Sequence, residues 1–213
     1  MEPIYKNLYQ FSTYIPPMDF TIHQYLLASD PAIMFATGTV RQAETILPQI
    51  KEILGNKPLK YIFVSHVESD ECGGISEFMR EYPNVKILCS ALAARELPGY
   101  GYTGEIIIVL PEKELKGGEL DLQFFDYPSE VHLQNGVVCL EKNSGIFYSG
   151  DLMLRTGNGV GKVMTTKWSD EVGAIDEERV PSVKLAEKLK ADLLAVSPDF
   201  IAVGHGFCVE CEK

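Results

Sequence analysis

Short apolar runs alternate along the chain with segments of helical periodicity. Apolar runs that are continuous or that alternate with polar residues predict strands, because successive side chains of a strand point to opposite faces. Apolar residues spaced three and four apart predict helices, because this spacing lines one helix face. The predicted strands are residues 21–28, 32–36, 61–65, 85–88, 105–110, 120–126, 137–141, 146–149, 193–196 and 200–203. The predicted helices are residues 40–54, 75–82, 91–97 and 181–191.

The clearest helical pattern begins at residue 40. Apolar side chains recur at positions 40, 43, 46, 47, 50, 53 and 54, and Gly55 then favours a helix end. Pro48 lies inside this stripe. We expect it to kink or interrupt the helix, because proline lacks the amide proton that a helix interior uses.

The order of the elements predicts the fold class. Strand–helix units dominate the first half of the chain, whereas strands 137–141 and 146–149 are joined by a short turn, residues 143–145, that favours a hairpin. Two mixed sheets packed face to face, with helices outside, accommodate both patterns. We therefore expect an α/β (α+β) fold, a four-layer αββα sandwich, with residues 1–213 as a single domain. The alternative is a generic α/β domain with one sheet.

Composition and charge narrow the function classes. The chain has 19 Lys and Arg against 30 Asp and Glu, a net charge of -11, whereas nucleic-acid and lipid-surface binders need a basic face. No window approaches the roughly 18 apolar residues of a membrane helix, and the first residues lack a signal-peptide pattern. Five scattered cysteines are typical of a reducing compartment. We expect a cytoplasmic protein that binds neither nucleic acid nor membrane.

The candidate chemistry begins directly after the predicted strand 61–65. If the chain stays extended there, His66, Glu68 and Asp70 point to one side and bring an imidazole and two carboxylates together. Glu71 follows at once, and two glycines at 73 and 74 allow a tight turn into a helix. The alternative interpretation is a solvated acidic loop with an incidental histidine.

Three further residues strengthen the first interpretation. His132 follows strand 120–126, Asp151 follows strand 146–149, and His205 follows strand 200–203. A single histidine at a strand end is more often a structural residue. Three of the four histidines and an aspartate in the same topological position indicate a metal site at one edge of the sandwich.

This pattern resembles the metallo-β-lactamase fold superfamily from about residue 20 to residue 206. Within it, Glu68 in place of a second histidine is similar to the diiron domain of flavodiiron proteins and to stand-alone oxygen-binding diiron proteins. The resemblance implies two iron ions. One would be held by His66, Glu68 and His132, and the other by Asp70 and His205, with Asp151 bridging the two.

The donor chemistry agrees with iron. A carboxylate in place of an imidazole makes the site harder and more negative, which suits iron or manganese better than a zinc hydrolase site. Two departures from the family pattern stand out. Glu71 replaces a histidine, and it either ligates the second iron or leaves that position to water. Ala36 replaces the aspartate of an Asp-Thr-Gly turn, which we interpret as loss of a supporting contact rather than of a ligand.

The resemblance implies a non-heme diiron oxidoreductase that binds or reduces O2 or NO. Full-length flavodiiron proteins add a flavodoxin domain, and we expect no flavin in this chain. Electrons would then come from an external donor such as rubredoxin or a flavodoxin-like protein, and the resemblance implies a homodimer. Two alternatives stay open: a dinuclear zinc or manganese hydrolase of esters or thioesters, and a non-catalytic O2 sensor.

A C-x-x-C pair close to the chain end, Cys208 and Cys211, is consistent with several roles. Three interpretations stay open. The pair could have no essential role, it could act as an electron relay or redox switch, or it could join subunits through a metal or a disulfide.

Overall fold

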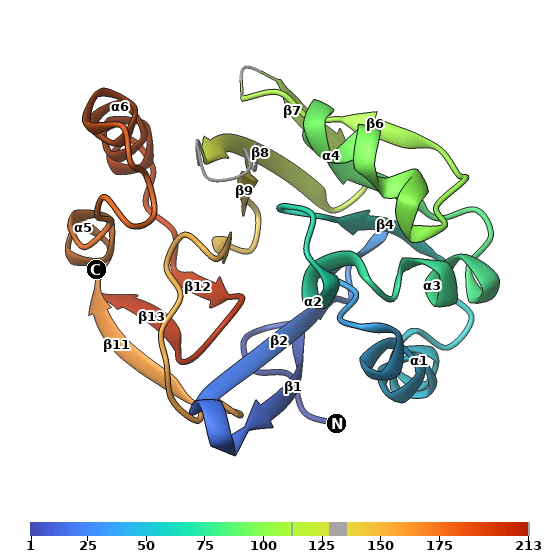
Figure 1. Cartoon of the computed structure of the whole chain (residues 1–213). Coiled ribbons are helices and arrows are strands. Elements are labelled where there is room, and N and C mark those ends of the chain that lie inside the picture. The colour runs from blue at the N-terminus through green and yellow to red at the C-terminus, as the bar shows by residue number, and fades with distance from the viewer. Residues whose placement is uncertain (112, 128–135, 213) are drawn as a thin grey trace.

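Two mixed sheets form the centre of the computed structural model, which describes residues 1–111, 113–127 and 136–212 (Figure 1). The first sheet has the order β1 (Leu8–Ile15), β2 (Phe20–Leu27), β3 (Ala32–Phe35), β4 (Leu59–Phe63), β5 (Lys86–Cys89) and β6 (Ile106–Ile108). The second has the order β11 (Val163–Lys167), β13 (Cys208–Glu212), β12 (Phe200–Val203), β10 (Ile146–Gly150), β9 (Gly136–Glu141), β8 (Leu120–Tyr127) and β7 (Glu114–Gly117).

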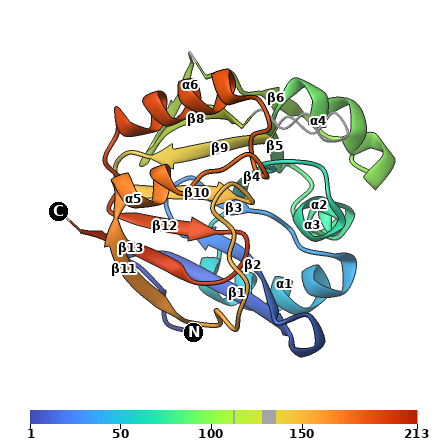
Figure 2. The ribbon, with the colours of Figure 1, turned by 60° about the vertical axis from the view of Figure 1, so that its left-hand side comes forward.

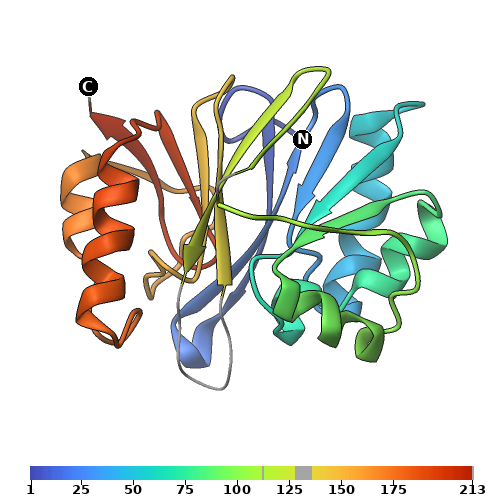
Figure 3. The same cartoon turned by 90° about the horizontal axis from the view of Figure 1, so that it is seen from above.

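Helices cover the outer face of each sheet. On the first sheet lie α1 (Val40–Leu54), α2 (Ser69–Cys72), α3 (Ile75–Glu81) and α4 (Ala91–Glu96), and on the second lie α5 (Trp168–Gly173) and α6 (Val183–Leu194). Figure 3 shows the resulting succession of helices, sheet, sheet and helices, and Figure 2 shows α6 lying over β8, with which it makes contacts. The predicted four-layer sandwich is therefore confirmed, and the single-sheet alternative is wrong.

Two apolar clusters hold these layers together. Between the sheets, the ring of Phe63 from β4 stacks on Phe124 from β8, and Tyr148 from β10 packs against Phe35 and Phe63. A second cluster lies between the first sheet and helices α1, α3 and α4, and includes the buried side chains of Ile50 and Phe78. Burying apolar surface on both faces of a sheet explains why strands such as β3 and β4 are almost continuously apolar.

Three expectations about individual elements need correction or extension. Helix α1 runs through Pro48 without interruption, because a capping box at Thr39 and a buried face stabilise the turns on both sides. Residues 193–196 are not a strand, since Leu193 and Leu194 are the last turn of α6. Strands β1, β7, β11 and β13 were not predicted, because they carry polar side chains on their exposed faces or lie at sheet edges.

Short connections complete the fold. The 3-10 turn Pro16–Met18 lies between β1 and β2, and the 3-10 turn Leu97–Tyr100 lies between α4 and β6. Residues 143–145 join β9 to β10 as the predicted hairpin. Within the described residues, no helix has the length and apolar character needed to cross a bilayer.

Candidate metal centre

The candidate ligands lie where three strands of the two sheets end. His66 follows β4 of the first sheet, whereas Asp151 directly follows β10 and His205 follows β12 of the second sheet. Strands β10 and β12 are parallel neighbours, so their carboxyl ends bring Asp151 and His205 to the same edge. The site is thus built across the interface between the sheets.

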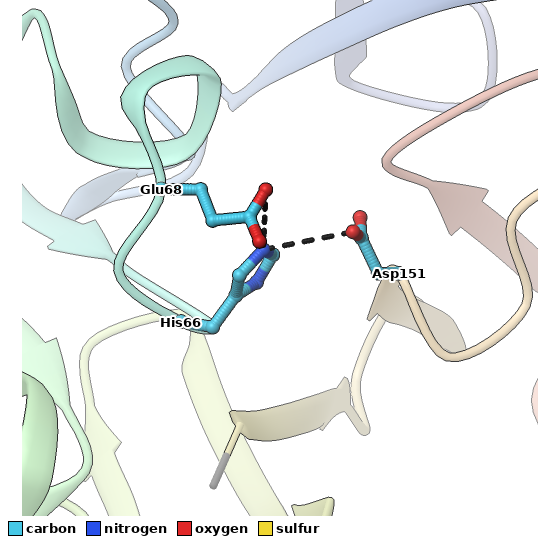
Figure 4. A group of neighbouring side chains, drawn as sticks. All are labelled: His66, Glu68 and Asp151. Carbon is cyan, nitrogen blue, oxygen red and sulfur yellow. Dashed lines mark ion pairs between the residues drawn. The ribbon is translucent and has the colours of Figure 1, made fainter. Parts of the chain in front are cut away.

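One half of the site consists of His66, Glu68 and Asp151 (Figure 4). Their possible ligand atoms all lie within 4.8 Å of one another. His66 Nε2 lies 3.9 Å from Glu68 Oε2 and 3.6 Å from Asp151 Oδ2. The His66 ring is 7% exposed, whereas the Glu68 side chain reaches in from the solvent side. One imidazole and two carboxylates at this spacing are a donor set that could hold a cation.

The other half consists of His205, Asp70 and the same aspartate. His205 Nε2 lies 3.1 Å from Asp151 Oδ1 and 3.6 Å from Asp70 Oδ2. The two oxygens of Asp151 therefore face different imidazoles. A carboxylate that presents one oxygen to each of two donor groups has the arrangement of a bridging ligand.

Local backbone geometry explains how neighbouring residues divide between the two halves. The chain bends at Ser65 and His66, is extended at Glu68, which precedes α2, and Asp70 then lies within that short helix. The expected extended run from His66 to Asp70 is therefore wrong, because the chain bends at His66 and becomes helical after Glu68. The helical turn directs Asp70 toward His205, whereas His66 and Glu68 face the first half of the site.

Both imidazoles are oriented by hydrogen bonds at Nδ1. His205 Nδ1 donates to the carbonyl oxygen of Thr21 at 2.9 Å, because a carbonyl can only accept. His66 Nδ1 lies 2.8 Å from Ser65 Oγ, whose hydroxyl donates to Glu71. In each ring the proton of the neutral form is thus fixed on Nδ1, and the lone pair of Nε2 faces the carboxylates.

The charges of the site are mutually dependent. Burial disfavours the His66 imidazolium, but the surrounding carboxylates, Glu68 first, outweigh burial and raise the pKa of His66 to about 9. The pKa of His205 is raised in the same way against burial, chiefly by Asp151. In return, the two imidazoles hold the pKa of Asp151 below its usual value despite its burial. The groups therefore form a compact set of opposite charges.

Glu71 has a different environment. Its side chain is buried, and Oε1 accepts hydrogen bonds from the amide of Ser65 at 2.9 Å and from its hydroxyl at 2.7 Å. Oε2 accepts from the hydroxyl of Tyr148 at 3.0 Å. Burial raises the pKa of this carboxyl. Both oxygens of Glu71 thus have protein donors.

Strand β2 supports the site through hydrogen bonds to the residues on either side of His205. The amide of His23 donates to the carbonyl of Gly204 at 2.9 Å, and His23 Nε2 donates to the carbonyl of Gly206 at 2.7 Å. These bonds hold the residues on either side of His205. Sequence reasoning did not identify the role of Thr21, which acts through its backbone carbonyl, or the role of Ser65, whose only signal is its place beside His66.

The structure brings together five of the seven predicted ligands, His66, Glu68, Asp70, Asp151 and His205. His132 lies outside the described residues. The donors that converge fit a pair of hard or borderline cations, since Nε2 of each imidazole lies within 4.0 Å of two carboxylates. The backbone of Glu71 is held as well, because the amide of Thr37 donates to the Glu71 carbonyl at 2.7 Å.

Comparison with known proteins gives a family match over most of the chain. The family model described as "ODP family beta lactamase" matches residues 20–206. The rubredoxin oxygen:oxidoreductase from the anaerobe Desulfovibrio gigas has a similar structure, with a TM-score of 0.80 and 17% identity over 99% of this chain and 57% of that chain.

One further solved structure and one sequence relative are also similar to this chain. A putative diflavin flavoprotein A 5 fragment from Nostoc sp. PCC 7120 gives a TM-score of 0.78 at 16% identity, covering 98% of this chain and 88% of that chain. A curated rubredoxin-oxygen oxidoreductase from Megalodesulfovibrio gigas is 20% identical over 90% of this chain. The chain spans at most 50% of the length of the curated relatives it matches. At these identities, the solved structures establish the fold.

Proposed function

The chain belongs to the ODP family of the beta-lactamase fold, and from this premise we propose that it is a diiron oxidoreductase that binds and reduces O2 or NO. The observation that supports the proposal most strongly is the position of Asp151, whose two oxygens face the imidazoles of His66 and His205 separately. Residues 1–213 would act as a single diiron domain.

Each residue would have a defined role. His66 and Glu68 would hold one iron together with His132, Asp70 and His205 would hold the other, and Asp151 would join them. The pair of irons would supply the binding site for the gas and the capacity to pass electrons to it. The chain's own contribution is to fix the imidazoles through Ser65 and Thr21 and to bring carboxylate charge that balances the cations.

The electron source belongs to the same proposal. The relatives from Desulfovibrio gigas and Megalodesulfovibrio gigas are named as rubredoxin-oxygen oxidoreductases, which supports an external donor such as rubredoxin or a flavodoxin-like protein. We also propose that the protein is a homodimer that functions in a reducing cytoplasm. Light scattering of the metal-loaded protein would measure its oligomeric state.

Metal analysis of protein purified without oxygen tests the proposal first. We expect two irons per chain, and two zinc or manganese ions with no iron would contradict it and favour a hydrolase. The reduced protein is then exposed to limiting O2, or to NO in a parallel sample, with and without reduced rubredoxin. Repeated gas consumption that depends on rubredoxin would support the reductase. A single, long-lived coloured adduct without turnover would contradict reduction and favour a sensor.

A further inference from the structure

The carboxylate of Glu71 is turned away from the two imidazole Nε2 atoms. In the part of the chain that the structure describes, the acidic partners within 4.0 Å of these atoms are Glu68, Asp70 and Asp151. Both Glu71 oxygens instead accept hydrogen bonds inside the protein, two at Oε1 and one at Oε2. A carboxylate with three protein donors has little remaining capacity to bind a cation.

Two hydrogen bonds link His66 to Glu71 through Ser65, and their direction follows from the single proton of the Ser65 hydroxyl. The Ser65 hydroxyl has one proton, and it donates that proton to Glu71 Oε1 at 2.7 Å. The hydroxyl oxygen of Ser65, which lies 2.8 Å from His66 Nδ1, must then accept the Nδ1 proton. This order leaves the Nε2 lone pair of His66 free to bind a cation.

We propose that Glu71 is a positioning residue rather than a metal ligand, and that it fixes the orientation and tautomer of His66 through Ser65. The inference rests on the proposed metal site. Its cation class is a divalent first-row metal bound at His66 Nε2. We call the chain of hydrogen bonds from His66 through Ser65 to Glu71 the Ser65 relay.

The environment of the Ser65 relay is rigid enough for this role. Ser65 and Glu71 are buried, and the hydroxyl of the fully buried Tyr148 holds the far oxygen of Glu71. On the other side, the amide of Thr37 donates to the Glu71 backbone carbonyl at 2.7 Å. Glu71 is thus held at both its side chain and its backbone. A carboxylate that accepts from a ligand's hydrogen-bond chain also makes the imidazole a stronger donor to the metal.

Zinc affinity of single variants distinguishes a positioning residue from a ligand. We would measure zinc binding by chelator competition for Ser65→Ala, Glu71→Ala and Glu71→Gln, with the exposed Ser169→Ala as the matched control. The relay predicts that Ser65→Ala and Glu71→Ala each weaken binding about 10–100-fold with two zinc ions still bound at saturation. Glu71→Gln should lose less zinc affinity than Glu71→Ala, because the amide oxygen of glutamine can still accept a hydrogen bond from Ser65.

The double variant Ser65→Ala/Glu71→Ala adds a stricter condition. Because both substitutions interrupt the same relay, their combined loss of affinity should be smaller than the product of the single losses. If Glu71 were a ligand, Ser65→Ala would have little effect, Glu71→Ala would lose one zinc equivalent, and the two effects would multiply. Either of these results would overturn the proposal.

Proton NMR of the zinc-loaded protein gives a readout that does not depend on affinity. The His66 Nδ1 proton should appear as a protected downfield resonance in the wild type and in Tyr148→Phe, which leaves the relay intact. It should be lost to exchange in Ser65→Ala. If Ser65→Ala does not fold, Glu71→Gln serves in its place, with a shifted resonance expected and an unchanged one contradicting the relay.

These measurements separate the relay from the proposed function. A chain that binds two zinc ions but no iron would contradict the diiron function and would leave the relay intact if the variants behave as stated. A chain that binds two irons, with Ser65→Ala silent in both affinity and NMR, would overturn the relay alone.

Discussion

A Cβ atom on Gly150 would lie 2.7 Å from the hydroxyl oxygen of Ser65. Gly150 also has a φ of +48°, in the left-handed region where a side chain is strained. The last residue of β10 therefore has to be glycine for two reasons, and one of them is the space needed by the residue that orients His66.

Replacing Gly150 by alanine should destabilise the protein and weaken metal binding together. We expect a loss of at least about 1 kcal/mol in the free energy of unfolding from backbone strain, and lower zinc affinity because Ser65 must move. Urea unfolding and chelator competition would measure the two effects. Gly173→Ala is the control, since the described residues place no neighbouring atom within 4 Å of its added Cβ. Unchanged affinity in Gly150→Ala would contradict the role of this contact.

Replacing Asp151 by asparagine should lower the metal content from two equivalents to one or fewer. The amide nitrogen cannot ligate a cation as the lost oxygen could, so one of the two imidazoles loses its carboxylate partner. Metal analysis after anaerobic loading would measure the content. Glu52→Gln, at an exposed position on α1, should retain two equivalents. Full metal content in Asp151→Asn would argue against a bridging aspartate.

The stability of the metal-free protein should depend on His23 at acidic pH. Burial, together with the nearby His205, lowers the pKa of His23 to about 4. Its unfolded value is about 6.5, so its stabilising contribution is present above that pH and is lost as the pH falls toward 4. The full effect is about 3 kcal/mol, since one pKa unit corresponds to about 1.4 kcal/mol.

Thermal unfolding at pH 7 and pH 4.5 would measure this dependence, with His23→Gln as the comparison. Glutamine does not titrate, so the variant should lose less stability between the two pH values than the wild type does. Other acidic groups and the histidines of the metal site titrate in both proteins, and the difference between them isolates His23. Parallel pH profiles would contradict a buried neutral imidazole.

Cys208 and Cys211 should not form a disulfide with each other. They are three positions apart on β13, which places their Cα atoms about 10 Å apart, beyond the roughly 7 Å limit for a disulfide. Burial raises the pKa of Cys208 to about 11 and that of Cys211 to about 12, so both thiols stay protonated at neutral pH.

Mass spectrometry after iodoacetamide treatment would check this expectation. Native protein should be alkylated slowly at these two positions, and protein in denaturant should be alkylated fully. After mild oxidation, the native chain should keep its mass. A loss of two mass units localised to the pair would restore the redox-switch interpretation of the C-x-x-C sequence.

Much of the fold could be predicted because its core strands are apolar on both faces. Residues 200–203 are a continuous apolar run, residues 146–149 are an apolar run that ends in Ser149, and the structure has β12 and β10 at those positions. Edge strands such as β1 lack this signal, because most side chains of β1 are partly exposed and polar residues occur on both of its faces. Leu193 and Leu194 were assigned to a strand because a short apolar run does not distinguish a strand from a helix end.

The site was predictable to the extent that its residues follow strands. His66, Asp151 and His205 meet because the ends of β4, β10 and β12 meet, and strand ends can be located from sequence. The orientation of Glu71 could not be predicted, since it depends on Tyr148, which is 77 positions away in the chain. The support of His205 could not be predicted either, because it comes from a backbone carbonyl of β2, which any residue could provide.

The two halves of the candidate site are anchored in different sheets. His66, Glu68 and Asp70 follow β4 of the first sheet, whereas Asp151 and His205 follow strands of the second. A cation bound to both groups is therefore a cross-link between the layers of the sandwich. A bound cation would stabilise the folded sandwich, because unfolding either sheet by a denaturant, or opening it to a protease, would first require the cation to be lost. Emptying it would remove this cross-link and leave the apolar cluster between the sheets to hold the two layers together.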